Sequence, residues 1–149
     1  MADIVYQPVS RIMRDFLIEE GLGFAYSSGT DWAIATTAMP KLPLNCITIH
    51  DEAAQKKVRV HSGNVQEDPV VLIEVRSTNH EPGQYKAKLI MEAMDGLSYW
   101  TWTGDSNEYS QTVVFATARR SRGVYDLGMD ENGRFLFNLE FALVIQSIN

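Results

Sequence analysis

Two histidines and an aspartate are the side chains whose types could support hydrolytic chemistry. His50 precedes Asp51, and His61 stands beside a serine. A serine nucleophile of this kind sits on a strained Gly-x-Ser-x-Gly turn, and the sequence has no such turn. We therefore favour the interpretation that these are ordinary strand-end residues. One alternative stays open: a small ligand-binding or hydrolytic α+β domain that uses His50, Asp51, His61 and Trp100.

The sequence also lacks a recognisable metal or thiol site. The candidate metal ligands are His50, Asp51, His61 and His80. No two of them have the spacing of a known ligand pair on a helix. Cys46 lies in an apolar stretch without a basic neighbour, which is typical of a buried structural cysteine. Asp130 begins a turn that resembles a calcium loop, but the closing glutamate is absent. We predict no catalytic residue, no cofactor and no metal.

Three arginines lie within four positions of an otherwise acidic chain. Arg119, Arg120 and Arg122 are expected to form a compact basic turn. Either this turn is solvated, or it pairs with carboxylates of a neighbouring subunit, because arginine favours bidentate interface contacts. Contact with DNA phosphates is a lesser alternative. Trp100 and Trp102 would fall on one face of a strand, where packing in the core or an interface is favoured over stacking on bases or sugars.

The last predicted strand, Arg134–Gln146, organises the rest of the chain. Its odd positions from Phe135 to Ile145 are all large and apolar, whereas its even positions are mixed. Strand side chains alternate between faces, so one face is built for a core and the other is only partly covered. A long apolar strand at a sheet edge would aggregate, so we place this one centrally. The polar turn Gly128–Gly133 reverses the chain just before it.

Two helices are predicted, at Pro8–Glu20 and at Glu81–Asp95, because both have apolar residues at helical spacing. Further strands are expected at Phe24–Tyr26, Trp32–Ala35, Leu44–His50, Val58–His61, Val70–Arg76, Tyr99–Trp102 and Thr112–Ala118. We expect residues 44–50 and 58–61 to form a hairpin, and residues 70–76 to be buried on both faces. The sum is an α+β fold: a mainly antiparallel mixed sheet with two helices packed on one face.

The overall composition is that of one folded domain spanning residues 1–149. Hydrophobic residues make up 45% of the chain and charged residues 21%, which excludes a disordered protein. The net charge of −6 argues against general binding to nucleic acid or anionic lipid. No stretch approaches the roughly 20 apolar residues that span a bilayer, so no membrane is expected as a partner.

Three segments, in this order, resemble the tail terminator (tail completion) proteins of long-tailed bacteriophages. They are the strand Pro69–Arg76, the helix Gln84–Leu97, and the turn with its strand, Leu127–Phe141. An opening helix also fits the family pattern. Met129 departs from it, since the family often has a basic residue there.

The resemblance implies a structural virion protein rather than an enzyme. Such a protein is assembled in the host cytoplasm into a six-membered ring that belongs to the tail or neck. The ring would cap the tail tube, end its elongation and dock the head-completion or connector protein. DNA would pass through the lumen without specific binding. A head–tail connector or other neck protein is the near alternative. We place subunit or tube contacts at Arg76, Arg119, Arg120, Arg122, Asp130 and Arg134, with Arg76 pairing with a carboxylate.

Overall fold

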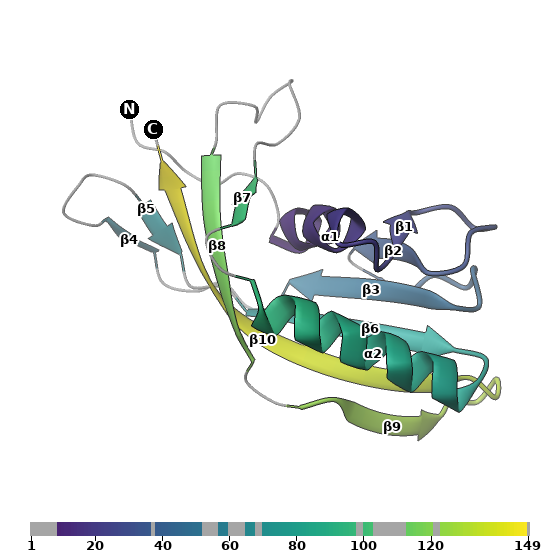
Figure 1. Ribbon diagram of the computed structural model, residues 1–149. Coiled ribbons are helices and arrows are strands. Elements are labelled where there is room, and N and C mark those ends of the chain that lie inside the picture. Colours follow the sequence, from purple (N-terminus) through teal and green to yellow (C-terminus); the bar gives the residue numbers. More distant parts are fainter. Residues whose placement is uncertain are drawn as a thin grey trace.

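A computed structural model describes most of the chain (Figure 1). The described residues are 9–36, 38–51, 57–59, 65–67, 70–97, 100–102, 113–120 and 123–148. His61 and Arg122 lie outside them. For Arg119 and Arg120 the description is confined to the backbone.

These residues form two helices and ten strands, with six strands after the first helix and four after the second. The helices are α1 (Val9–Glu19) and α2 (His80–Asp95). The strands are β1 (Phe24–Ala25), β2 (Ala33–Thr36), β3 (Cys46–Asp51), β4 (Lys57–Arg59), β5 (Val65–Glu67), β6 (Val70–Ser77), β7 (Trp100–Trp102), β8 (Val113–Arg120), β9 (Tyr125–Met129) and β10 (Phe135–Ile148). Both predicted helices and the long last strand are confirmed within a residue or two.

The last strand, β10, is the centre of the sheet, as its sequence predicts. Its first half pairs with β6 on one edge and with β9 on the other. Its second half pairs with β5 and β8. All four pairings are antiparallel. Beyond β6 the sheet continues through β3, β2 and β1, which lie at the upper right of Figure 1, far from β9.

The sheet is mixed and mainly antiparallel, which confirms the predicted α+β class. Only β1–β2 and β2–β3 are parallel among the described pairs. The predicted hairpin between residues 44–50 and 58–61 is wrong. β3 pairs with β2 and β6, whereas β4 pairs with β5, a three-residue strand where we expected only loop. Strand β8 also extends to Arg120, so Arg119 and Arg120 end a strand instead of forming a turn.

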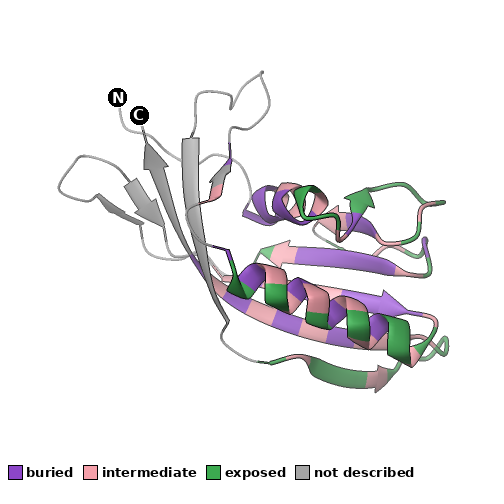
Figure 2. Cartoon of the chain, viewed as in Figure 1, coloured by how far each residue is buried: buried purple, intermediate pink, exposed green. Residues whose placement is uncertain are grey.

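The core is a single cluster of buried side chains from both helices and from the sheet. Its members on β3, β6 and β10 occupy odd-numbered positions: Ile47, Ile49, Val71, Ile73, Val75, Phe137, Leu139, Phe141 and Leu143. Figure 2 shows the resulting alternation of buried and half-buried residues along β10. The packing of both helices on one face stays a prediction. On β6, Val71, Ile73 and Val75 are fully buried, but Leu72 and Glu74 are half-buried, so this strand is not buried on both faces.

Helix α1 is fixed at both ends by side chains from the sheet. At its start, the Asp51 carboxylate accepts from the Ser10 amide at 2.8 Å and the Ser10 hydroxyl at 2.7 Å. An N-terminal amide of a helix has no partner within the helix, so Asp51 acts as a cap. Toward its end, the Trp102 and Trp100 indoles of β7 donate to Asp15 and Glu19. The predicted packing role of both tryptophans is confirmed, since both belong to or border the core.

Helix α2 lies close to the sheet at Gly83. A Cβ built on Gly83 would stand 2.7 Å from the Phe137 ring of β10 and 2.7 Å from Cβ of Ser77. These distances are well inside van der Waals contact, so only glycine allows this approach. The absent side chain therefore sets how closely the first turn of α2 meets the core strands.

Candidate assembly surfaces

Asp130 and Arg134, two predicted contact residues, meet in the turn between β9 and β10. Oδ1 of Asp130 accepts from the Asn132 and Arg134 amides at 2.8 and 2.9 Å. The Arg134 guanidinium lies 3.9 Å from the same carboxylate. The hydrogen bond from the Arg134 amide is the main cause that lowers the pKa of Asp130 below 3.8. Asp130 thus holds the turn closed. Because β9 extends to Met129, the turn is shorter than the predicted turn Gly128–Gly133.

Arg76, expected to pair with a carboxylate, is committed to backbone carbonyls instead. The residue is only 5% exposed. Its guanidinium donates to the carbonyls of Leu44 at 3.2 Å, Lys41 at 3.1 Å and Pro43 at 2.6 Å. Arg134 reaches the Lys41 carbonyl as well, at 3.3 Å. The two arginines therefore fasten the segment 38–45, which precedes β3, over the ends of β6 and β10.

Arg119 and Arg120 are not brought to this turn. They pair across from Ala142 and Phe141 in the second half of β10. Seven to eight strand residues from Arg134 correspond to about 25 Å. The structure therefore separates the predicted contact residues into two groups, one at each half of β10.

The described residues of the hydrolytic alternative, His50, Asp51 and Trp100, are engaged in separate internal contacts, and His61 lies outside the described residues. Nε2 of His50 lies 2.8 Å from a carboxylate oxygen of Glu74. Asp51 caps α1, and Trp100 donates to Glu19. Across the described ranges, no group of three or more histidine, cysteine, aspartate or glutamate side chains is placed to hold a metal ion. Cys46 is buried as expected, and that burial raises the pKa of its thiol.

The edge strand β9 carries three exposed apolar side chains, which we call the β9 surface: Tyr125, Leu127 and Met129. Tyr125 pairs with Asn138 and Met129 with Phe135, so these two side chains lie on opposite faces of the sheet. Their exposed fractions are 48%, 52% and 60%. Leu127 is the extra residue of a β-bulge opposite Leu136 and Phe137, and Gly128 beside it has a φ of 79°. Tyr125 and Leu127 line a groove of about 180 Å³.

That groove lies on the sheet face opposite the core. Leu72, Asn138 and Glu140, its remaining lining residues, occupy even positions of β6 and β10. The predicted, partly covered second face is confirmed, because the even positions 136–142 of β10 are half-buried. At the same edge, Asp126 points to the helix side, where Nε2 of His80 lies 2.7 Å from its carboxylate. The hydrogen bond with His80 is the main cause that lowers the pKa of Asp126.

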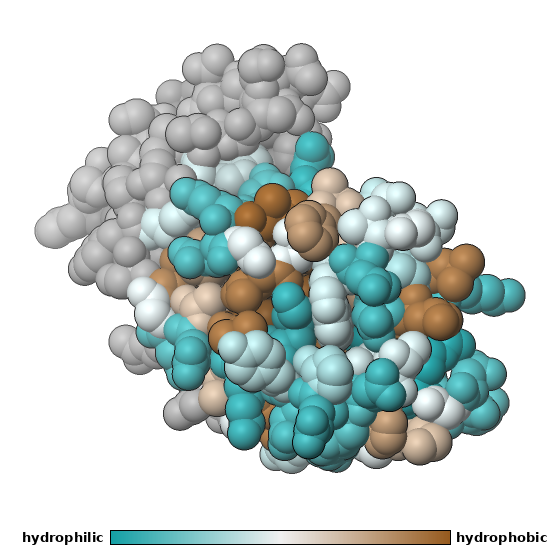
Figure 3. Space-filling model, turned by 45° about the vertical axis from the view of Figure 1, so that its right-hand side comes forward, coloured by the Kyte–Doolittle hydropathy of each residue, from teal (hydrophilic) through white to brown (hydrophobic). Residues whose placement is uncertain are grey.

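The opposite edge of the sheet carries a second exposed apolar set, which we call the β1 surface: Phe24, Tyr26, Leu42 and Leu44. Their exposed fractions range from 45% to 57%. The Tyr26 hydroxyl donates to the Leu42 carbonyl at 2.9 Å, so both parts are tied together. In Figure 3, which turns the right-hand side of Figure 1 forward, apolar atoms reach the surface in separate patches among polar ones.

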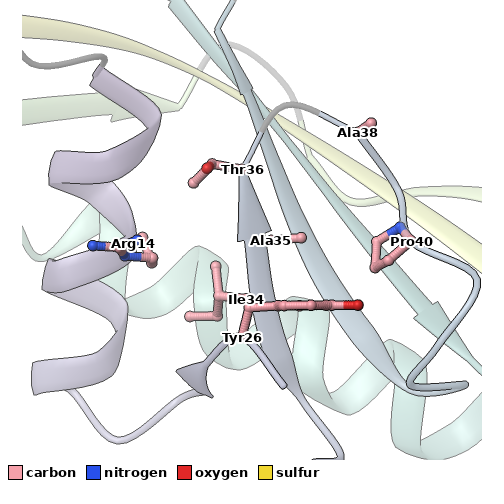
Figure 4. Close-up of a pocket in the computed structure, with 7 residues that line it drawn as sticks. All are labelled: Arg14, Tyr26, Ile34, Ala35, Thr36, Ala38 and Pro40. Carbon is pink, nitrogen blue, oxygen red and sulfur yellow. The ribbon is translucent and has the colours of Figure 1, made fainter. Parts of the chain in front are cut away.

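A cavity of about 300 Å³ lies beside this set, along the outer edge of β2 (Figure 4). It is lined by Arg14, Tyr26, Ile34, Ala35, Thr36, Ala38 and Pro40. Arg14 stands on α1 at one side, and Pro40 lies at the other, with the Tyr26 ring extending toward it. β1 pairs only with Ala33 and Ile34, so within the described strands the outer edge of β2 at Ala35 and Thr36 has no partner.

Neither surface is evident from the sequence. Residues 125–129 alternate between apolar and other side chains, a pattern that by itself indicates a half-buried strand. The structure shows instead that β9 is an edge strand whose three apolar side chains are about half exposed. The only available signal was the turn at 130–133, which fixes β9 as the neighbour of β10 and thereby leaves its other side open.

Comparison with known proteins identifies the family. Residues 17–147 match the family described as bacteriophage tail terminator protein. No curated protein matches the chain. Among the described residues, no helix combines the length and apolar character needed to cross a membrane. The matched span runs from within α1 almost to the end of β10 and includes both surfaces defined above. The chain therefore belongs to the bacteriophage tail terminator family and is a structural component of the virion.

Proposed function

We propose that this protein closes into a ring, six-membered as the resemblance implies, that caps the finished tail tube, ends its elongation and presents the docking face for the head connector. The observation that carries the proposal is the family match over residues 17–147. A ring forms when each subunit uses two different surfaces, because a contact between unlike surfaces repeats around an axis until it closes. The β9 and β1 surfaces are two such surfaces, and they lie at opposite edges of one sheet.

The charge of the subunit supports a passage for DNA through the ring. The net charge is −6. A lumen with negative charge repels the phosphate backbone and does not trap it in transit. The contacts with the tail tube and between subunits are proposed to include Arg119, Arg120, Arg122, Asp130 and Arg134, while Arg76 acts indirectly by holding segment 38–45.

Tail-tube assembly in the presence of the purified protein tests this function. Tail tube protein from the same phage is polymerised with and without the full chain, and tube lengths are measured by electron microscopy. We expect shorter tubes with a ring at one end, and light scattering of the protein on tubes should give a discrete multiple of the subunit mass. Unchanged tubes, together with binding to isolated heads, would instead identify a neck protein.

A further inference from the structure

We propose that copies of this chain join head to tail, with the β9 surface of one copy docked in the cavity beside β2 of the next. The inference rests on the proposed ring and specifies its subunit contact. The occupant of the cavity is thus a second copy of the same chain. Both edges are open in the described part of the sheet: β9 pairs only with β10, and β1 covers only half of β2.

Topology is the first reason. The β9 surface and the β2 cavity lie at opposite edges of the sheet, so one copy cannot bring its own two edges together. A contact between two copies covers the β9 surface of one and the β2 cavity of the other, and the pair still offers one free edge of each kind to further copies. An uncovered apolar edge strand is a template for uncontrolled pairing, so natural sheets cover such edges. Here Leu127 and Met129 are more than half exposed in the single chain.

Size and chemistry are the second reason. The cavity of about 300 Å³ accommodates several water molecules, or one or two aliphatic side chains. Its lining is mostly apolar and includes Tyr26, Ile34, Ala35, Ala38 and Pro40. Leu127, set outward by the bulge, has the shape and character to enter such a space. The backbone edge of β2 at 35–36 can then pair with an incoming strand.

Charge is the third reason. Arg14 is the one charged side chain among the described lining residues of the cavity, and Lys41 is exposed nearby in segment 38–45. Part of the Arg14 guanidinium pairs with Asp15. The β9 edge and its turn bear the carboxylates of Asp126, Asp130 and Glu131, of which Asp126 is bound to His80 and Asp130 lies 3.9 Å from Arg134. Glu131 is therefore the carboxylate that a head-to-tail contact would bring toward Arg14 and Lys41. A symmetric contact of β9 with β9 would place Glu131 near its own copy, which is unfavourable.

Cross-linking between single-cysteine surfaces tests the contact. Leu127→Cys and Ala38→Cys variants are mixed, alone and on tail tubes, and treated with a short bis-maleimide linker. Background from Cys46 is low because that side chain is fully buried. We expect dimers in the mixture and a ladder up to the closed ring in the double variant. Tyr85→Cys, at the most exposed large apolar side chain on α2, serves as the matched control and should link to neither surface.

A substitution series adds a second measurement. Leu127→Asp should weaken association by about tenfold or more, because a charge would enter the apolar cavity. Tyr85→Asp, with an exposed fraction of 65%, should leave association unchanged. Circular dichroism of both variants controls for folding.

The outcomes separate this inference from the proposed function. A ring that caps tubes without a link between positions 127 and 38 overturns the inference and leaves the function intact. Self-linking of Leu127→Cys alone reveals a symmetric contact, and a link from it to tube protein reveals another occupant; either result overturns the inference. A chain that stays monomeric alone and on tubes overturns both.

Discussion

Replacing Arg76 by methionine should destabilise the single subunit before it affects any contact between subunits. The guanidinium donates to three carbonyls of segment 38–45 and is 5% exposed. Methionine fills much of the space of the aliphatic stem but supplies no donor. If Arg76 instead paired with a neighbour's carboxylate, its loss would weaken assembly while leaving the subunit stable. An internal role of Arg76 therefore predicts that subunit stability falls first, whereas an interface role predicts that assembly weakens first.

The expected loss follows from the three acceptors. Pro43 is buried, so its carbonyl would remain without a partner, which costs about 1–3 kcal/mol. Lys41 and Leu44 are exposed, so their carbonyls can turn to water and contribute about 1 kcal/mol together. Removal of a buried charge also removes its desolvation cost, which keeps the total near about 3 kcal/mol. For a domain of this size that corresponds to a fall in Tm of about 6–12 °C.

Urea denaturation and limited trypsinolysis provide the assay. Arg76→Lys keeps the charge, but its single ammonium group cannot reach all three carbonyls as the planar guanidinium does. It should therefore lose roughly half as much stability as Arg76→Met. Lys88→Met, on the exposed side of α2, is the control and should change stability by less than about 0.5 kcal/mol. Cleavage after Lys41 should accelerate only in the Arg76 variants. An Arg76→Met subunit as stable as the wild type and cut no faster would refute the reasoning.

Three other perturbations have definite expected results. Asp51→Ala removes the cap of α1 and should cost about 1 kcal/mol in urea denaturation, with Asp51→Asn milder. Gly83→Ala should destabilise by about 1–2 kcal/mol despite the better helix propensity of alanine, because its Cβ would overlap the core, whereas Gly29→Ala, in open space, should be neutral. The folded pKa values of Asp126 and Asp130 lie below 3.8, so both carboxylates stabilise the hairpin above that pH. That contribution is lost as the pH falls through the folded pKa values. The double variant Asp126→Asn, Asp130→Asn should therefore lose less stability than the wild type as the pH is lowered.

The sequence predicts well those elements whose pattern extends over several periods. β10 offers six apolar positions in strict alternation, and each helix repeats its stripe over two turns or more. Such patterns report which side of an element is buried, and the cluster of buried residues agrees with them. They do not report which strands are neighbours. Strands β1, β2, β4 and β5 have two to four residues each, too few to carry a period, and their pairing was missed or wrong.

The role of Arg76 illustrates a different limit. An arginine at the end of an apolar strand has no local feature that distinguishes an exposed contact from an internal clamp. The distinction arises only because segment 38–45 returns across the second sheet face, where Met39 lies against Thr48 and Cys46. That return depends on contacts between residues more than thirty positions apart. The exposure of the β9 surface is equally invisible in the local sequence, because it depends on the sheet ending at β9.

The separation of the arginines along β10 also changes what they are expected to do. Strands β8 and β9 pair with the same edge of β10, with Arg120 opposite Phe141 and Arg134 at the hairpin turn. A standard contact of about 800 Å² per partner is roughly 30 Å across, so one centred on β9 would reach both groups only at its rim. Charges at a rim govern the rate and salt dependence of association more than its strength. Arg134→Gln removes this charge and keeps a donor for the Lys41 carbonyl, so it should slow ring assembly and alter its salt dependence, while Leu127→Asp weakens the assembled ring itself. Stopped-flow light scattering at two salt concentrations measures both, and equal effects of the two variants on dissociation would place Arg134 at the centre of the contact instead.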